Sequence, residues 1–451
     1  MAFSATLAVF IAISLALNLW FVTRDKVVNA FILFFAVLLF IPPEAIGLIS
    51  GSPYGTSGIL NMSMAAYDAV ILFACLVVTR KLKIQKISVT GLVVMSCCLV
   101  IILMRICADG SGALSNKMID NYFVPMLAAV SMSRVLNPDD MPKLLKFIYA
   151  FILINAAVAC IELVIKQSLL FDAYYLKTVK WYRGAHNIYR ADLQFRGTAF
   201  LGHPLVNGVY YLLGIVYLYN KPVPGMMKNV RLTVLKALQF ALLTGAILST
   251  NSRGALLVFA VYTVIYLYTN KKIGKLLLLL ICVAVLIVAL DFEKIYNSLF
   301  ARDTSGDSLM GRFKGLTVFG ELPLESIMLG EGLNKIASLL TSYDMTSNFE
   351  ISYLIIILEI GFIGFVIWVI AMIAMYSPKM AVTVGDIKAK SMVNGMILCF
   401  LLISATGNLI GDPGTLNYML WALLAFSRVL SKGNNGGVPQ RTLINRANTI
   451  G

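Results

Sequence analysis

Two arginines, Arg196 and Arg253, stand at predicted helix starts, where their charge could bind a phosphate. Arg196 precedes an apolar run that has Pro204 in its first turn, where proline is favoured in helices. Arg253 follows the capping residues Thr250 and Ser252. A helix N-terminus carries about half a positive charge and unpaired N–H donors, so it repels a guanidinium unless an anion neutralises both. If the two segments converge, they form a phosphate clamp; in the structural alternative, Arg253 only extends to the membrane interface.

A third helix start is predicted after Ser347-Asn348-Phe349-Glu350, which has the spacing of a capping box. We expect it to begin the helix of the apolar run 351–376. The first arginine of the clamp lies in a basic, aromatic-rich stretch, 166–208, which also contains both histidines of the chain, His186 and His203. Such a stretch between membrane spans is expected to contact an anionic ligand, and a solvated surface loop is the alternative.

The composition is that of a membrane protein. Of the 451 residues, 59% are hydrophobic and only 13% are charged, and the mean hydropathy is +0.84. These values are far too apolar for a soluble globular protein. The net charge of +15 is explained by basic cytoplasmic loops, so no nucleic-acid partner is expected. The seven cysteines lie in or beside apolar runs without metal-ligand spacing, and we interpret them as small buried residues.

The fold predicted from these features is all-α, a polytopic transmembrane helical bundle of about 12–14 spans, each approaching the roughly 20 residues that cross a bilayer. The apolar runs lie near 3–22, 27–48, 62–79, 88–106, 119–135, 144–165, 203–219, 236–250, 254–269, 275–291, 351–376, 391–410 and 416–430. The first run is followed by Arg24 and Lys26, the wrong polarity for a cleaved signal peptide, so we expect it to remain as a membrane anchor.

Lysines and arginines cluster in alternate short loops, which the positive-inside rule places in the cytoplasm. Both long hydrophilic loops and the turn Thr250–Gly254 then face outward. The predicted organisation is N-terminal transmembrane helices (1–165), a basic extracytoplasmic loop (166–202), central transmembrane helices (203–291), a second extracytoplasmic loop (292–350), C-terminal transmembrane helices (351–430) and a disordered cytoplasmic tail (431–451). The sequence contains no Walker motif and no Gly-rich dinucleotide fingerprint.

Several short motifs occur in order between the apolar runs: Phe195–Pro204, Ser252–Leu257, Gly311–Gly315, Leu329–Gly332, Ser347-Asn348 and Glu359–Gly364. Their order, loop positions and spacing resemble the O-antigen polymerase and ligase superfamily of bacterial inner-membrane glycosyltransferases. The resemblance covers roughly residues 195–366, and the N-terminal half contributes only hydropathy.

The resemblance implies an enzyme of the bacterial inner membrane that takes a glycan from undecaprenyl diphosphate and joins it to an acceptor sugar, at a site facing the periplasm. In that family, the arginines that match Arg196 and Arg253 are thought to hold the diphosphate. The ligase branch has a histidine where this chain has Ser347. This difference favours a polymerase of lipid-linked repeat units, for O-antigen, capsule or exopolysaccharide, over a ligase that transfers finished glycan to lipid A core.

Residue roles follow from this chemistry. Four residues could act as the base for the acceptor hydroxyl, namely Asp192, His203, Asp344 and Glu350, and the sequence does not choose among them. His203 as a turn residue and Glu350 as a helix cap are the structural alternatives. The predicted catalytic residues are Arg196, Arg253, His203 and Glu350, and the predicted substrate-binding residues are Arg183, Tyr189, Arg190, Arg312 and Asn348.

The arginines of the second set would add charge or hold the glycan, and Tyr189 would stack on a sugar face or lie in an interfacial aromatic belt. No metal-ligand cluster is evident, so we expect metal-independent chemistry without a cofactor. The expected partners are the undecaprenyl diphosphate-linked oligosaccharide and the lipid bilayer, with a chain-length regulator and a flippase as candidate protein partners.

The competing class is a transporter, either a flippase for lipid-linked oligosaccharides or a solute permease. Transporters place ionisable groups or broken helices near the middle of the membrane. Here few charges lie within the apolar runs, chiefly Asp68, Arg105, Glu162 and Glu359, while basic residues gather in the outward loops. This distribution favours the enzyme.

Overall fold

The computed structural model describes residues 5–42, 62–82, 88–109, 118–169, 196–220, 230–250, 252–270, 316–332, 351–379, 384–405 and 415–432. Within these ranges the regular elements are helical and no strand occurs, as the all-α prediction requires. The elements are α1 (Ala5–Thr23), α2 (Val27–Phe40), α4 (Met64–Val78), α5 (Val89–Asp109), η3 (Ile119–Phe123), α7 (Val124–Val135), η4 (Pro138–Asp140), α8 (Met141–Ile165), α11 (Pro204–Asn220), α12 (Val230–Ser249), α13 (Arg253–Thr269), α17 (Leu324–Leu329), α19 (Ser352–Met375), α20 (Val384–Ser404) and α21 (Thr415–Val429).

Five of these helices are long and apolar enough to cross a membrane: α1, α5, α8 with the preceding η4, α19 and α20. Four apolar stretches are shorter, namely α2, α4, residues Val234–Ser249 of α12 and residues Gly254–Thr269 of α13. Every predicted apolar run that falls in the described ranges coincides with a helix, whereas the run 275–291 lies outside them. The total of about 12–14 spans stays a prediction. Helix α2 ends at Phe40 instead of residue 48, since the residue before a proline avoids the helical conformation and Pro42 and Pro43 follow.

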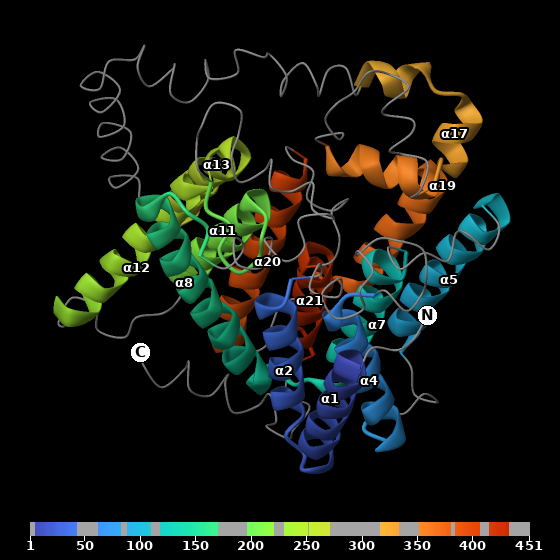
Figure 1. The fold of residues 1–451 in the computed structure, drawn as a ribbon, viewed down its shortest axis with the longest axis horizontal. Coiled ribbons are helices and arrows are strands. Elements are labelled where there is room, and N and C mark those ends of the chain that lie inside the picture. Colours follow the sequence, from blue (N-terminus) through green and yellow to red (C-terminus); the bar gives the residue numbers. More distant parts are fainter. Residues whose placement is uncertain are drawn as a thin grey trace, which may run out of the picture.

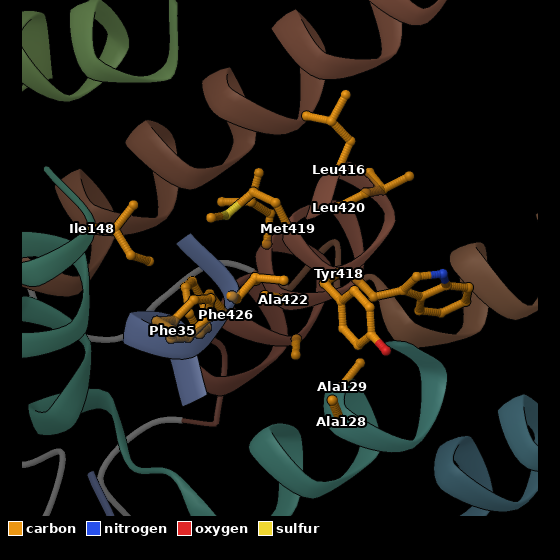
Figure 2. Packing of buried hydrophobic residues seen from close by; sticks show 14 of the residues in the cluster. Phe35, Ala128, Ala129, Ile148, Leu416, Tyr418, Met419, Leu420, Ala422 and Phe426 are labelled. Atoms are coloured by element: carbon orange, nitrogen blue, oxygen red, sulfur yellow. The ribbon is translucent and has the colours of Figure 1, made fainter. Parts of the chain in front are cut away.

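Helix α21 lies at the centre of the bundle (Figure 1). All of its side chains except that of Arg428 are buried. Figure 2 shows Tyr418 of α21 directed toward Ala128 and Ala129 of α7. The ring centroids of Phe426 and Phe35 of α2 are 5.9 Å apart. Small residues on α7 allow the two helices to approach closely, as is typical of packing between membrane helices.

The described basic residues at the ends of α19, α20 and α21 gather at one end of the bundle. The Nη1 atom of Arg428 donates to the carbonyl of Ala374 at 3.1 Å, and Lys390 Nζ donates to the carbonyl of Ser377 at 2.8 Å. Burial, together with the nearby charges of Arg134 and Arg428, lowers the pKa of Lys432 to about 8. The basic ends of α7, α19, α20 and α21 therefore lie together, in accord with one cytoplasmic face.

The helix N-termini of α11 and α21 lie at the other end of the bundle. Helix α21 has its C-terminus at the basic end of the bundle, so its first residue, Thr415, lies at the opposite end. The hydroxyl of Tyr210 in α11 donates to the carbonyl of Thr415 at 3.2 Å. The N-terminal half of α11 is therefore beside the N-terminus of α21, at the end that the charge distribution predicts to face outward.

This orientation predicts the activity of reporter fusions. Alkaline phosphatase fused after Glu321 or after Arg183 should be active, because this reporter folds only outside the cytoplasm. The same reporter fused after Lys83 or Met227 should be inactive. A cytoplasmic reporter, such as green fluorescent protein, should give the reverse pattern at all four sites. Active phosphatase at the Lys83 and Met227 sites only would reverse the topology and remove the outward-facing site.

Candidate anion-binding site

Arg196 is buried and fixed against the turn between α12 and α13. Its side chain is 6% exposed, and Nε donates to the carbonyl of Thr250 at 2.9 Å. The next residue, Gly197, donates its backbone N–H to the carbonyl of Ser249 at 3.0 Å. The segment that begins at Arg196 therefore runs along the C-terminal end of α12. A guanidinium anchored through Nε has its plane and direction set by the protein before any ligand binds.

The N-terminal parts of α11 and α13 pack against each other at the same place. A Cβ atom at Gly208 would lie 3.1 Å from Ala255 Cβ and 3.5 Å from Ser252 Cβ, so the absence of a side chain allows this approach. Ser252 is the N-cap of α13 and its side chain accepts from the N–H of Ala255, which confirms the predicted cap. Arg253 is the first residue of α13, and α11 begins at Pro204, as predicted.

Sequence reasoning did not recognise the role of Glu162, a fully buried residue in the last turn of α8. Its Oε2 atom accepts from the backbone N–H groups of Thr198 and Ala199, each at 2.9 Å. Its Oε1 atom accepts from the N–H of Leu169 at 3.0 Å and from the hydroxyl of Ser168 at 3.5 Å. One carboxyl group therefore holds both the start of the basic loop and the segment that follows Arg196.

Two asparagines complete the support of this segment, which we call the anchored loop (196–203). Asn155 Oδ1 accepts from the N–H of Phe200 at 2.9 Å, and Asn155 Nδ2 donates to Asn207 Oδ1 at 2.6 Å. Asn207 Nδ2 in turn donates to the carbonyl of Thr198. These bonds hold Ala199 in the left-handed region, at φ 41°, which a residue with a side chain adopts only when its surroundings require it.

Of the predicted site residues, the structure describes Arg196, His203 and the backbone of Arg253. Arg196 contacts the turn that leads to Arg253, and His203 is partly buried directly before α11. The other predicted residues lie outside the described ranges: Arg183, Tyr189, Arg190, Arg312, Asn348 and Glu350, with the alternative bases Asp192 and Asp344. The predicted capping box is wrong for α19, because this helix begins at Ser352, its N-cap is Ile351, and no side chain caps it.

Two further motifs meet at a second polar cluster, between α5, α17 and α19. Arg105 is 3% exposed, and its Nη1 donates to the carbonyls of Leu329 and Gly330 at 2.7 and 3.1 Å. The hydroxyl of Tyr122 donates to Glu359 Oε2 at 2.7 Å. The N–H of Glu331 donates to the carbonyl of Leu358 at 2.7 Å. The motifs 329–332 and 359–364, distant in sequence, thus lie side by side.

The contact depends on two glycines. Gly330 and Gly361 have φ of 81° and 79°, and Gly361, with ψ 163°, breaks α19. A Cβ atom at Gly361 would lie 2.3 Å from the carbonyl oxygen of Met328. This conformation is essentially restricted to glycine.

Gly361→Ala should therefore strongly reduce the amount of folded protein, since the strain of about 1–3 kcal/mol adds to a backbone clash. Membrane abundance and the melting temperature of the detergent-solubilised protein measure the loss. Gly320→Ala is the matched control, because nothing lies within 4 Å of a Cβ atom at Gly320. Equal abundance and equal melting temperatures for both variants would contradict the close approach.

Comparison of the sequence with protein-family models and with curated protein sequences gives no match.

Proposed function

We propose that this protein is a membrane glycosyltransferase that takes glycan from undecaprenyl diphosphate at the outer leaflet. The observation that carries the proposal is the anchoring of Arg196 to the turn that opens α13. Its Nε atom lies 2.9 Å from the carbonyl of Thr250, and Arg253 is the first residue of α13. Two arginine-bearing segments and the N-terminal parts of α11 and α13 thus meet at one place. Arginine side chains and helix N-termini both favour a bound diphosphate.

The proposed reaction needs charge stabilisation more than acid catalysis. The acceptor hydroxyl oxygen bonds to the anomeric carbon of the donor sugar while the bond from that carbon to the diphosphate oxygen breaks. The diphosphate leaves with the electron pair, and the hydroxyl proton passes to a base. Arginine suits the leaving group because it binds phosphate through two parallel hydrogen bonds and stays protonated. His203 is the last residue of the anchored loop and is the base we propose among the described residues.

Within this class we propose a polymerase of lipid-linked repeat units, because Ser347 stands where the ligase branch has histidine. Deleting the gene should leave glycans with at most one repeat unit on the lipid carrier. Loss of a ligase would instead leave full-length polymer on undecaprenyl diphosphate. Electrophoresis of glycolipids extracted from the deletion strain separates the two outcomes. A persisting ladder of long chains on the lipid carrier would contradict the polymerase and favour ligation to lipid A core.

One structural feature favours the transporter alternative. Glu359 is buried in α19 next to the break at Gly361, and broken membrane helices with buried ionisable groups are typical of transporters. Purified protein in detergent micelles tests the two classes, since micelles have no sides across which to transport. Formation of lipid-linked dimers of the repeat unit in micelles requires an enzyme. If purified, folded protein forms no such dimers but moves lipid-linked oligosaccharide across the membrane of proteoliposomes, the protein is a transporter.

A further inference from the structure

A buried carboxyl group lies between α1 and α4, away from the anchored loop. Asp68 of α4 and Asn18 of α1 are fully buried, and Ser14, one turn earlier in α1, is 4% exposed. Asp68 Oδ1 accepts hydrogen bonds from Asn18 Nδ2 at 2.8 Å and from the hydroxyl of Ser14. One carboxyl oxygen therefore receives two donors from α1 and joins the two helices.

Two acceptors in this cluster have no hydrogen-bond partner within the described part of the chain. They are Asp68 Oδ2 and Asn18 Oδ1, both buried. If the carboxyl group is ionised, Asp68 Oδ2 and Asn18 Oδ1 both stay unsatisfied, and a buried unsatisfied acceptor destabilises the folded protein, most of all when it is charged. A single proton removes both deficits. As a carboxylic acid, Asp68 can donate its O–H to Asn18 Oδ1 while Asn18 Nδ2 donates to Asp68 Oδ1, which makes the cyclic acid–amide pair.

The helices packed against α4 offer no countercharge near Asp68 within the described residues. Helices α1 and α2 contain no titratable side chain, and α7 has only Arg134, in its last turn. Helix α4 itself adds only Tyr67 and Cys75, whose side chains are neutral. Asp120 of η3 accepts from the hydroxyl of Ser63, the N-cap of α4, and as a carboxyl group it offers no positive charge. A buried carboxylate without a countercharge is strongly unfavourable, so the group takes up a proton instead.

We propose that Asp68 and Asn18 form an intramembrane proton-binding site, in which the proton on Asp68 Oδ2 is donated to Asn18 Oδ1. A metal ion fits less well. Hard cations such as Ca²⁺ and Mg²⁺ take about six oxygen ligands or more, and this cluster has two unused oxygens in the described part of the chain. A proton needs only the two oxygens that are present.

The bound proton holds α1 to the rest of the protein. Helix α1 is buried only along the stripe Leu7, Ser14, Asn18 and Val22, and its other side chains are largely exposed. Loss of the proton would leave a buried charge and two unsatisfied acceptors in the middle of this stripe. We expect α1 to pack less firmly when Asp68 is ionised.

Infrared difference spectroscopy of the purified full-length protein tests the site. At pH 7, wild-type protein should show a carboxylic-acid C=O band that is lost in Asp68→Asn and shifted in Asn18→Leu. Asp68→Asn should keep the wild-type melting temperature, because its amide nitrogen can donate to Asn18 Oδ1 in place of the acid. Asp68→Leu should lower the melting temperature by several degrees. Asp139→Asn, at an exposed carboxyl group, is the control and should change neither the band nor the melting temperature.

Three results would overturn the proposal. The first is the absence at pH 7 of any acid band that depends on Asp68. The second is an Asp68→Asn variant that melts as early as Asp68→Leu, since this would require a negative charge at the site. The third is loss of the band when choline chloride is replaced by sodium chloride at constant pH, which would assign the site to Na⁺.

Discussion

Arg253→Lys should lower glycan transfer by about 100- to 1,000-fold, which is the usual effect of removing one donor from a developing negative charge. Lysine keeps the charge at the first residue of α13 but loses the two parallel donors that match a diphosphate oxygen pair. Arg253→Ala also loses the charge, and its activity should fall further. Transfer is measured as the rate at which lipid-linked dimers of the repeat unit form with purified protein in micelles.

Arg196→Lys should show a loss of similar size for an additional reason. Lysine carries all its donors on one nitrogen, so a lysine held by the carbonyl of Thr250 cannot also present a parallel pair of donors from two separate nitrogens. Protein abundance must be measured alongside, because Arg196 is buried and also joins the anchored loop to the turn. Arg24→Lys, an exposed arginine at the basic end of the bundle, is the control and should leave transfer unchanged. Normal polymer from both Arg196→Ala and Arg253→Ala, at normal protein abundance, would contradict the clamp.

The helices could be predicted from sequence because the requirement of the bilayer is local. A run of apolar residues must form all of its backbone hydrogen bonds within itself, so each apolar run in the described ranges is a helix. The start of α13 was equally predictable, since Ser252 caps a donor only three residues along the chain. Pro204 gave the same local signal at the start of α11.

The break in α19 could not be predicted, because its cause is distant in sequence. The run 351–376 has the composition of one continuous helix, and glycine is common inside membrane helices. Gly361 adopts a non-helical conformation where Gly330 packs against its backbone. The predicted cap at Ser347–Glu350 is also wrong for α19. Spacing alone indicated a capping box, whereas the helix begins at Ser352 with Ile351 as its N-cap and without a side-chain cap.

The role of Glu162 was also inaccessible to sequence reasoning. A single glutamate in an apolar run indicates only that a partner must exist. Its partners are backbone N–H groups of residues 169, 198 and 199 and the hydroxyl of Ser168, and backbone donors have no sequence signature. The same holds for Asn155 and Asn207, which support the anchored loop from two helices.

Glu162→Gln should abolish most transfer, although it preserves the shape of the side chain. Both carboxyl oxygens of Glu162 accept hydrogen bonds, so an amide must point its NH₂ group at N–H donors on one side. The two backbone donors of Thr198 and Ala199, or that of Leu169, then lose their acceptor, at about 1–3 kcal/mol for each buried group. The loop that carries Arg196 should shift as a result. Binding of undecaprenyl diphosphate to the purified variant, measured by fluorescence quenching, should weaken together with transfer.

Asp68→Asn makes the same chemical change at another fully buried carboxyl group and is the matched comparison. There only Oδ1 accepts hydrogen bonds, and Oδ2 accepts none from the described residues, so an amide nitrogen in the place of Oδ2 leaves no donor without its acceptor. We therefore expect opposite outcomes, with transfer retained in Asp68→Asn and lost in Glu162→Gln. In an Arg196→Ala background, Glu162→Gln should weaken diphosphate binding no further, because Glu162 acts on the ligand through the anchored loop. Additive losses of binding in the double variant would show that Glu162 acts independently of Arg196.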